Sequence, residues 1–147
     1  MTSEVMAALR VLGQPAPMDD DPLLSAMPFA LASGFELLER RADLVEGRVD
    51  WAPERCTAGG VLHGGVLMSL ADTLGAVCAF LNLPPGAGTS TIESKTNFFR
   101  AVREGTVHGR ARPVHVGRTT IGVQTELRDD RDRLVSLTFQ TQAVLAG

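Results

Sequence analysis

The sequence has little of what marks disulfide-bonded, metal-binding or nucleic-acid-binding proteins. It has two cysteines, Cys56 and Cys78, with no CxxC pair, and its three histidines, His63, His108 and His115, lack the grouping of metal ligands. Neither a disulfide framework nor a metal site is therefore expected. The formal net charge is -3, and lysines and arginines form no basic run. Nucleic acid is accordingly not expected as a partner.

Long apolar runs are also missing. No apolar stretch approaches the roughly 20 residues that a membrane-spanning helix needs. Near the start of the sequence, Glu4 and Arg10 interrupt the apolar residues, a pattern unlike that of a signal peptide. We therefore expect a cytoplasmic protein with no membrane partner. Cys78 lies among apolar residues and is expected to be a small buried hydrophobe, whereas Cys56 is expected to be a free thiol in a loop.

The residues that are present suffice for one compact domain with a hydrophobic core. The chain has 147 residues, of which 44% are hydrophobic and 21% charged. Residues 1–28 are expected to form a helical preface, because apolar residues recur at helical spacing in residues 3–12 and a second short helix is expected at Leu23–Met27. Residues 29–147 then form the main domain.

Within the main domain, the hydrophobic pattern changes from strands to one helix and back to strands. Residues 35–51 predict two strands, with Glu46-Gly47 at the turn or just after it. Residues 56–65 are a glycine-rich loop, and from about Gly64 to Leu81 the apolar residues follow helical spacing on nearly every face. A helix without a polar face must be surrounded by protein.

The alternating pattern after Gly88 predicts about four antiparallel strands, and charged residues 128–133 form an exposed hairpin turn. One long central helix wrapped by a curved antiparallel sheet of about five to six strands is the α+β arrangement that buries such a helix.

The glycine-rich loop runs directly into the long helix. Glycines let backbone N–H groups approach a ligand closely, and the first amides of a helix lack partners within the helix. Together with the helix dipole, these amides suit a developing oxyanion. A tight loop-to-helix turn would need the same small residues, so the glycines alone leave both interpretations open.

Asp72 stands out in the long helix. It is the only carboxylate between Glu54 and Glu93, and its neighbours are apolar. Aspartate is a poor interior helix former, and a buried carboxylate is costly without a partner. Asp72 could form a structural hydrogen bond to a neighbouring backbone group or hydroxyl. The interpretation that we favour is a general base or nucleophile in a cleft.

At this loop and helix the sequence resembles the hotdog-fold thioesterases, specifically their PaaI-like (phenylacetate-pathway) branch. That branch carries a Gly-x-x-His-Gly-Gly loop, followed nine residues after the histidine by an aspartate on the helix. The matching positions here are Gly60, His63, Gly64, Gly65 and Asp72. The resemblance covers roughly residues 30–146, including the turn at residues 116–119. It implies a hotdog fold and the hydrolysis of acyl-CoA thioesters, with no metal or further cofactor.

The resemblance also implies a role for each residue of the motif. The amide of Gly64 and the His63 loop would polarise the thioester carbonyl, with His63 organising the loop rather than acting as a base. Asp72 would activate water or attack the carbonyl, and Thr91 matches a hydroxyl residue that helps to orient the water. Thr57 departs from the family, which commonly has asparagine six residues before the histidine.

Arginines and a second subunit complete the expected site. Arg100, Arg103 and Arg118 are candidates to contact the phosphates of CoA, although a single arginine is more often a solvated surface charge. His63 and Asp72 are nine positions apart, about 13.5 Å along a helix, and project to opposite sides. One chain cannot easily place both around one carbonyl. The resemblance implies the same arrangement, a homodimer or homotetramer with active sites at the subunit interface.

Two other functions fit the same fold. A non-catalytic acyl-CoA-binding or regulatory hotdog protein would use the carboxylate only to order the pocket. A hotdog hydratase or dehydratase would pair a catalytic histidine with a nearby acidic residue, whereas here the histidine lies in the oxyanion loop. We rank hydrolysis first.

Overall fold

A computed structural model describes residues 22–146. Two short helices come first, and one long helix separates a pair of strands from four further strands. The elements are α2 (Pro22–Ser25), α3 (Pro28–Ala32), β1 (Phe35–Arg41), β2 (Leu44–Asp50), the 3-10 helix η2 (Pro53–Arg55), α4 (Gly64–Phe80), β3 (Gly88–Phe98), β4 (Thr106–Val116), β5 (Thr120–Asp129) and β6 (Leu134–Leu145). The helix expected at residues 3–12 lies outside the described residues.

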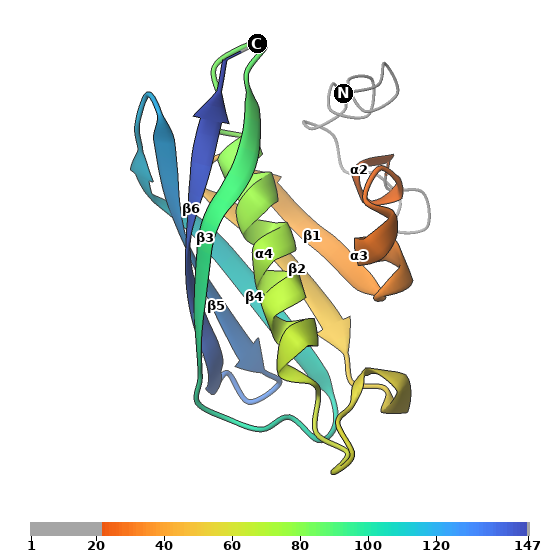
Figure 1. Cartoon of the computed structure of the whole chain (residues 1–147). Coiled ribbons are helices and arrows are strands. Elements are labelled where there is room, and N and C mark those ends of the chain that lie inside the picture. Colours follow the sequence, from red (N-terminus) through yellow and green to blue (C-terminus); the bar gives the residue numbers. More distant parts are fainter. Residues whose placement is uncertain (1–21, 147) are drawn as a thin grey trace.

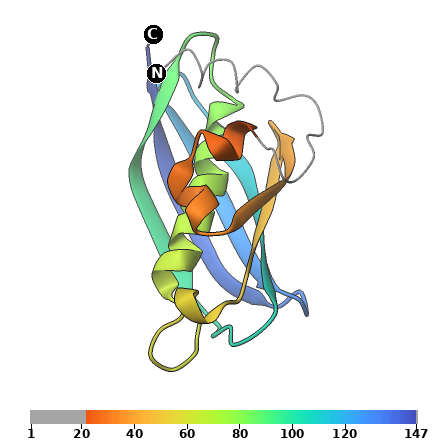
Figure 2. The ribbon, with the colours of Figure 1, turned by 90° about the vertical axis from the view of Figure 1, so that its right-hand side faces the viewer.

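The six strands form one antiparallel sheet in the order β1-β2-β4-β5-β6-β3. The long helix α4 crosses the inner face of this sheet (Figure 1), and α2 and α3 lie beside it on the same side of the sheet (Figure 2). The predicted α+β hotdog fold is therefore confirmed. The short helix expected at Leu23–Met27 begins one residue earlier, as α2, and is followed by α3.

The core lies between α4 and the inner face of the sheet. Eight residues of α4 are buried, as the apolar pattern predicted: Leu67, Leu70, Ala71, Leu74, Gly75, Val77, Cys78 and Ala79. Burial raises the pKa of the Cys78 thiol to about 11, so Cys78 is a buried uncharged side chain, as expected. The helix ends at Phe80, one residue before the predicted end, and Pro84 follows shortly after.

Two glycines under α4 set how closely the helix approaches the sheet. The β1–β2 turn lies at residues 42–43, so Gly47 falls inside β2, where it pairs with Gly109 of β4. A β-carbon at Gly47 would lie 2.5 Å from the carbonyl oxygen of Glu36 in β1 and 2.7 Å from Leu74 Cδ2, and one at Gly109 would collide with Leu74 Cδ1. The two glycines therefore form a shallow seat for the Leu74 side chain. The sequence pattern predicts Gly47 at the β1–β2 turn or just after it. In the structure the close contacts inside β2, and not turn geometry, require a glycine at this position.

Strand β6 turns its polar face inward. Ser136, Thr138, Gln140 and Gln142 are all buried, whereas Phe139, on the opposite face, is 45% exposed. Strand alternation predicts two different faces but does not say which one packs against the helix. The inward polar residues lie beside α4, next to the edge strand β3.

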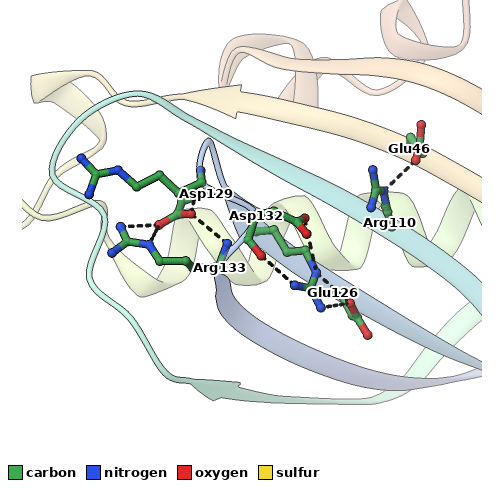
Figure 3. A network of polar contacts seen from close by, with 8 residues as sticks. Glu46, Arg110, Glu126, Asp129, Asp132 and Arg133 are labelled. Atoms are coloured by element: carbon green, nitrogen blue, oxygen red, sulfur yellow. Dashed lines mark hydrogen bonds and ion pairs between the residues drawn. The ribbon is translucent and has the colours of Figure 1, made fainter.

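The β5–β6 hairpin turn lies at residues 130–133, inside the charged segment 128–133 that was predicted to form it, and residues 117–119 join β4 to β5. Asp129 accepts hydrogen bonds from the backbone N–H groups of Arg131 and Arg133 and from Nε of Arg133, the last at 2.8 Å. These contacts, drawn in Figure 3, lower the pKa of Asp129 to about 2. Hydrogen bonds and an ion pair therefore order this exposed turn.

Candidate functional site

The glycine-rich loop ends in a capped helix start. His63 is the N-cap of α4, and its Nδ1 accepts a hydrogen bond of 2.8 Å from the N–H of Gly65. Because Nδ1 is the acceptor, the neutral ring carries its proton on Nε2. The carbonyl of His63 accepts the N–H of Val66 at 2.9 Å. His63 therefore joins the end of the glycine-rich loop to the first turn of α4 through both its side chain and its carbonyl.

The N–H of Gly64 differs from those of its neighbours. Among residues 22–146, no acceptor is paired with it, whereas Gly65 and Val66 both donate to His63. Its place at the first position of α4 puts it at the positive end of the helix dipole. The ring of Phe98 packs over Gly64, where a β-carbon would lie 3.2 Å from Phe98 Cζ. A small residue with a free amide therefore stands at the helix start.

Thr57 serves the loop itself. Its hydroxyl accepts the N–H of Gly59 at 3.4 Å, and its carbonyl accepts the N–H of Gly60 at 3.1 Å. Trp51 Nε1 also donates to the carbonyl of Gly60, at 3.1 Å. Within the described part of the chain, Thr57 has no hydrogen bond to His63. In this chain the hydroxyl closes a turn in the place where the family commonly has asparagine.

Asp72 is half-buried and held from the sheet side. Its Oδ1 accepts a hydrogen bond of 3.3 Å from Thr91 Oγ1 and one of 3.2 Å from Gln140 Nε2. Gln142 Nε2 donates to Thr91 Oγ1 at 2.8 Å, which leaves the Thr91 proton free to point at Asp72. Oδ2 of Asp72 has no hydrogen-bond partner within residues 22–146.

A surface depression of about 220 Å³ opens at Asp72. It lies between α3, α4 and β3, and its other lining residues are Phe29, Met68, Ser69, Thr73 and Ser94. Phe29 and Met68 expose apolar surface there. A carboxylate with one hydrogen-bonded oxygen and one oxygen without a partner among the described residues therefore lines a depression that has both apolar and hydroxyl side chains.

The structure brings some of the predicted site residues together and separates others. Asp72 and Thr91 are in contact, as are His63 and Gly65. From Gly64 to Asp72 the helix rises about 12 Å, so the free amide and the carboxylate of one chain are far apart. Within one chain, the Gly64 amide and the Asp72 carboxylate therefore do not face one another.

The three candidate arginines do not form one cluster within a chain. Arg103 donates to the carbonyl of Gly59 at 2.7 Å and so lies at the glycine-rich loop. Arg100 and Arg103 both lie in the connection between β3 and β4, before the first residue of β4. Arg118 lies beyond the other end of β4, whose residues span about 36 Å. Arg103 thus has a structural contact in the loop.

Gln140 and Gln142 donate to Asp72 and Thr91 respectively, and the sequence alone did not reveal these contacts. Both belong to the regular polar alternation of β6, which looks like an ordinary solvent-facing pattern. The one available signal was their position among the alternating residues opposite apolar Phe139.

Cys56 and Cys78 are both free, and the Cys56 thiol donates to the carbonyl of Ala52 at 3.2 Å. Residues 22–146 contain no group of three or more histidine, cysteine, aspartate or glutamate side chains placed to hold a metal ion. No helix in that range is both long and apolar enough to cross a membrane.

An antiparallel six-stranded sheet wrapped around one central helix is the hotdog fold. The structure of a thioesterase from Haemophilus influenzae superposes with a TM-score of 0.81 at 26% identity, covering 90% of this chain and 93% of that one. The sequence profile of the thioesterase superfamily matches residues 59–136, more than half of the chain. The chain belongs to the thioesterase superfamily.

Two relatives show how far the similarity extends. A protein of Mycobacterium tuberculosis, provisionally named an esterase, is 32% identical over 126 residues, 84% of this chain and 90% of that protein. The 1,4-dihydroxy-2-naphthoyl-CoA hydrolase of Escherichia coli is 34% identical over 86 residues, 58% of this chain and 63% of the hydrolase. The placement in the PaaI-like branch stays a prediction.

Proposed function

We propose that the protein hydrolyses acyl-CoA thioesters to a free acid and CoA, with Asp72 as the catalytic carboxylate. The observation that carries the proposal is the state of Asp72: Oδ1 is held by Thr91 and Gln140, while Oδ2 has no partner within the described residues and the carboxylate lines the depression. The similarity to a naphthoyl-CoA hydrolase supports CoA thioesters as the substrate class.

The proposed reaction assigns one task to each of two groups: the N–H of Gly64 stabilises the oxyanion, and Asp72 takes the proton of the attacking water. The N–H of Gly64 donates to the thioester oxygen and stabilises the oxyanion as water adds to the carbonyl carbon. Oδ2 of Asp72 accepts the proton of that water. When the tetrahedral intermediate collapses, the C–S bond breaks and the proton passes to the departing CoA thiolate. Neither step requires a metal.

Because the Gly64 amide and Asp72 of one chain are about 12 Å apart along α4, we further propose that each site is shared between two subunits of a homodimer or homotetramer. The edge strand β3 supports this proposal. Its outer edge has no partner strand within residues 22–146, and Ile92 on it is 63% exposed. An exposed edge of this kind is suited to pairing with a second copy.

The test is steady-state release of CoA from a panel of short-chain, long-chain and aryl acyl-CoAs. Asp72→Asn keeps the volume of the side chain but removes the ionised acceptor, so kcat should fall about 10²- to 10⁴-fold. Glu39→Gln, which neutralises a carboxylate on β1 away from the depression, should leave kcat unchanged. A folded Asp72→Asn protein with full activity would remove Asp72 from catalysis. Binding of acyl-CoA without any turnover would indicate the non-catalytic alternative.

Gly64→Pro tests the oxyanion donor. Proline removes the N–H, and the first position of a helix tolerates proline because that N–H has no partner within the helix. His63 has φ -64° and ψ 134°, a conformation that suits a residue before proline. We expect kcat to fall about 10²- to 10³-fold. Gly64→Ala, which keeps the N–H and adds a β-carbon, is the matched control for crowding against Phe98.

A further inference from the structure

Gln140 is a buried amide whose hydrogen bonds go to one acceptor residue. The side chain is 0% exposed, and its Nε2 lies 3.2 Å from Asp72 Oδ1 and 3.5 Å from the Asp72 carbonyl oxygen. Its Oε1 is buried without a partner among the described residues. A buried amide with an unsatisfied end costs free energy, commonly about 1–3 kcal/mol. Burying the Gln140 amide at this cost places its Nε2 in hydrogen-bonding contact with Asp72.

Helix α4 is shaped to admit this amide. Gly75 lies one turn after Asp72, and a β-carbon there would collide with Oε1 and Cδ of Gln140. Glycine inside a helix is less favourable than alanine by about 1 kcal/mol. Gly75 and Gln140 are each unfavourable on their own. The two residues fit together, because the Gln140 amide occupies the space that a β-carbon at position 75 would fill.

We propose that Gln140, seated against Gly75, is a positioning residue for Asp72, an inference that rests on the proposed catalytic role of Asp72. Thr91 approaches Oδ1 from edge strand β3, and Gln140 approaches it from the neighbouring strand β6. Two donors from different strands limit rotation of the carboxylate and keep Oδ2 directed at the depression. One donor alone would restrict that rotation less.

The burial of Gln140 predicts how its loss should appear in the kinetics. The side chain does not line the depression, so substrate has no access to it. Its effect should therefore be on kcat, through the orientation of Asp72, and not on KM. Displacing a catalytic group by about 1 Å or less is enough to lower the rate about 10- to 100-fold.

The experiment measures kcat and KM for Gln140→Met, which keeps the length of the side chain and removes the N–H donor. We expect a 10- to 100-fold lower kcat with KM within about twofold of the unsubstituted protein. Ser136→Ala is the matched control, because Ser136 is buried on the same inner face of β6 and its hydroxyl has no partner among the described residues. It should leave kcat unchanged.

A double-substitution cycle separates positioning from general structural support. In the Asp72→Asn background, Gln140→Met should cause no further loss of kcat, because the group it positions is already gone. Gly75→Ala should reproduce the loss by displacing the Gln140 amide, and should add nothing in a Gln140→Ala background. An equal fold-loss from Gln140→Met in both Asp72 backgrounds would overturn the inference.

The outcomes also distinguish the inference from the function on which it rests. Full activity of folded Asp72→Asn overturns the proposed function and the inference with it. An inactive Asp72→Asn together with unchanged kcat in Gln140→Met overturns the inference alone. If Gln140→Met does not fold, Gln140→Asn decides, because it keeps the amide but withdraws it from Asp72 and should lower kcat in the same way. Unchanged kcat in Gln140→Asn would refute positioning.

Discussion

Replacing Gly109 with alanine perturbs the contact that holds α4 close to the sheet. The new β-carbon would collide with Leu74 Cδ1 and lie 2.9 Å from Leu127 Cδ2. Leu74 and Leu127 are both 0% exposed, so neither side chain can move into solvent to make room. An added methyl in a packed core commonly costs about 1–3 kcal/mol, and we expect Gly109→Ala to lower the free energy of unfolding by that amount.

The assay is urea unfolding of four proteins: the unsubstituted chain, Gly109→Ala, Leu74→Ala and the double variant. All four are measured at one protein concentration, since subunit association would otherwise contribute to stability. Leu74→Ala alone should cost about 2–5 kcal/mol through the cavity it leaves. The double variant should cost less than the sum, because the methyl at Gly109 fills part of that cavity. Additive costs, or a neutral Gly109→Ala, would refute the proposed seat.

Two further predictions concern the subunit interface and the β5–β6 turn. Mixing inactive Asp72→Asn subunits with inactive Gly64→Pro subunits should restore up to half of the unsubstituted activity per heterodimer; verified heterodimers without activity would place both groups in one chain. The pKa of Asp129, about 2, lies below the ordinary value near 3.9, so its ionised form stabilises the fold above about pH 4 and this contribution is lost as the pH falls toward 2. Asp129→Asn should therefore destabilise the protein at pH 7 and much less at pH 2. A destabilisation of equal size at both pH values, measured by urea unfolding, would contradict the role of the ionised carboxylate.

Local sequence was sufficient for the elements whose determinants are close together in the chain. The helical spacing of apolar residues located α4 to within about one residue at its end, because periodicity and a following proline act within a few turns. The hydrogen bond that caps the start of α4 also depends on local sequence, because His63 and Gly65 are two residues apart. Asp72 stood out because a carboxylate in an apolar helix is costly wherever that helix packs.

Tertiary structure decided what surrounds Asp72. Gln140 follows it by 68 residues, and the two meet only because β6 lies between β5 and edge strand β3 beneath α4. Alternation along β6 predicted two unlike faces, but the inward face proved to be the polar one, contrary to burial by hydrophobicity alone. The need for glycine at positions 47 and 75 was likewise decided by tertiary structure. Each of these glycines makes room for another segment of the chain. The residues next to it in the sequence do not reveal that need, because the steric conflict exists only after the helix and sheet have packed.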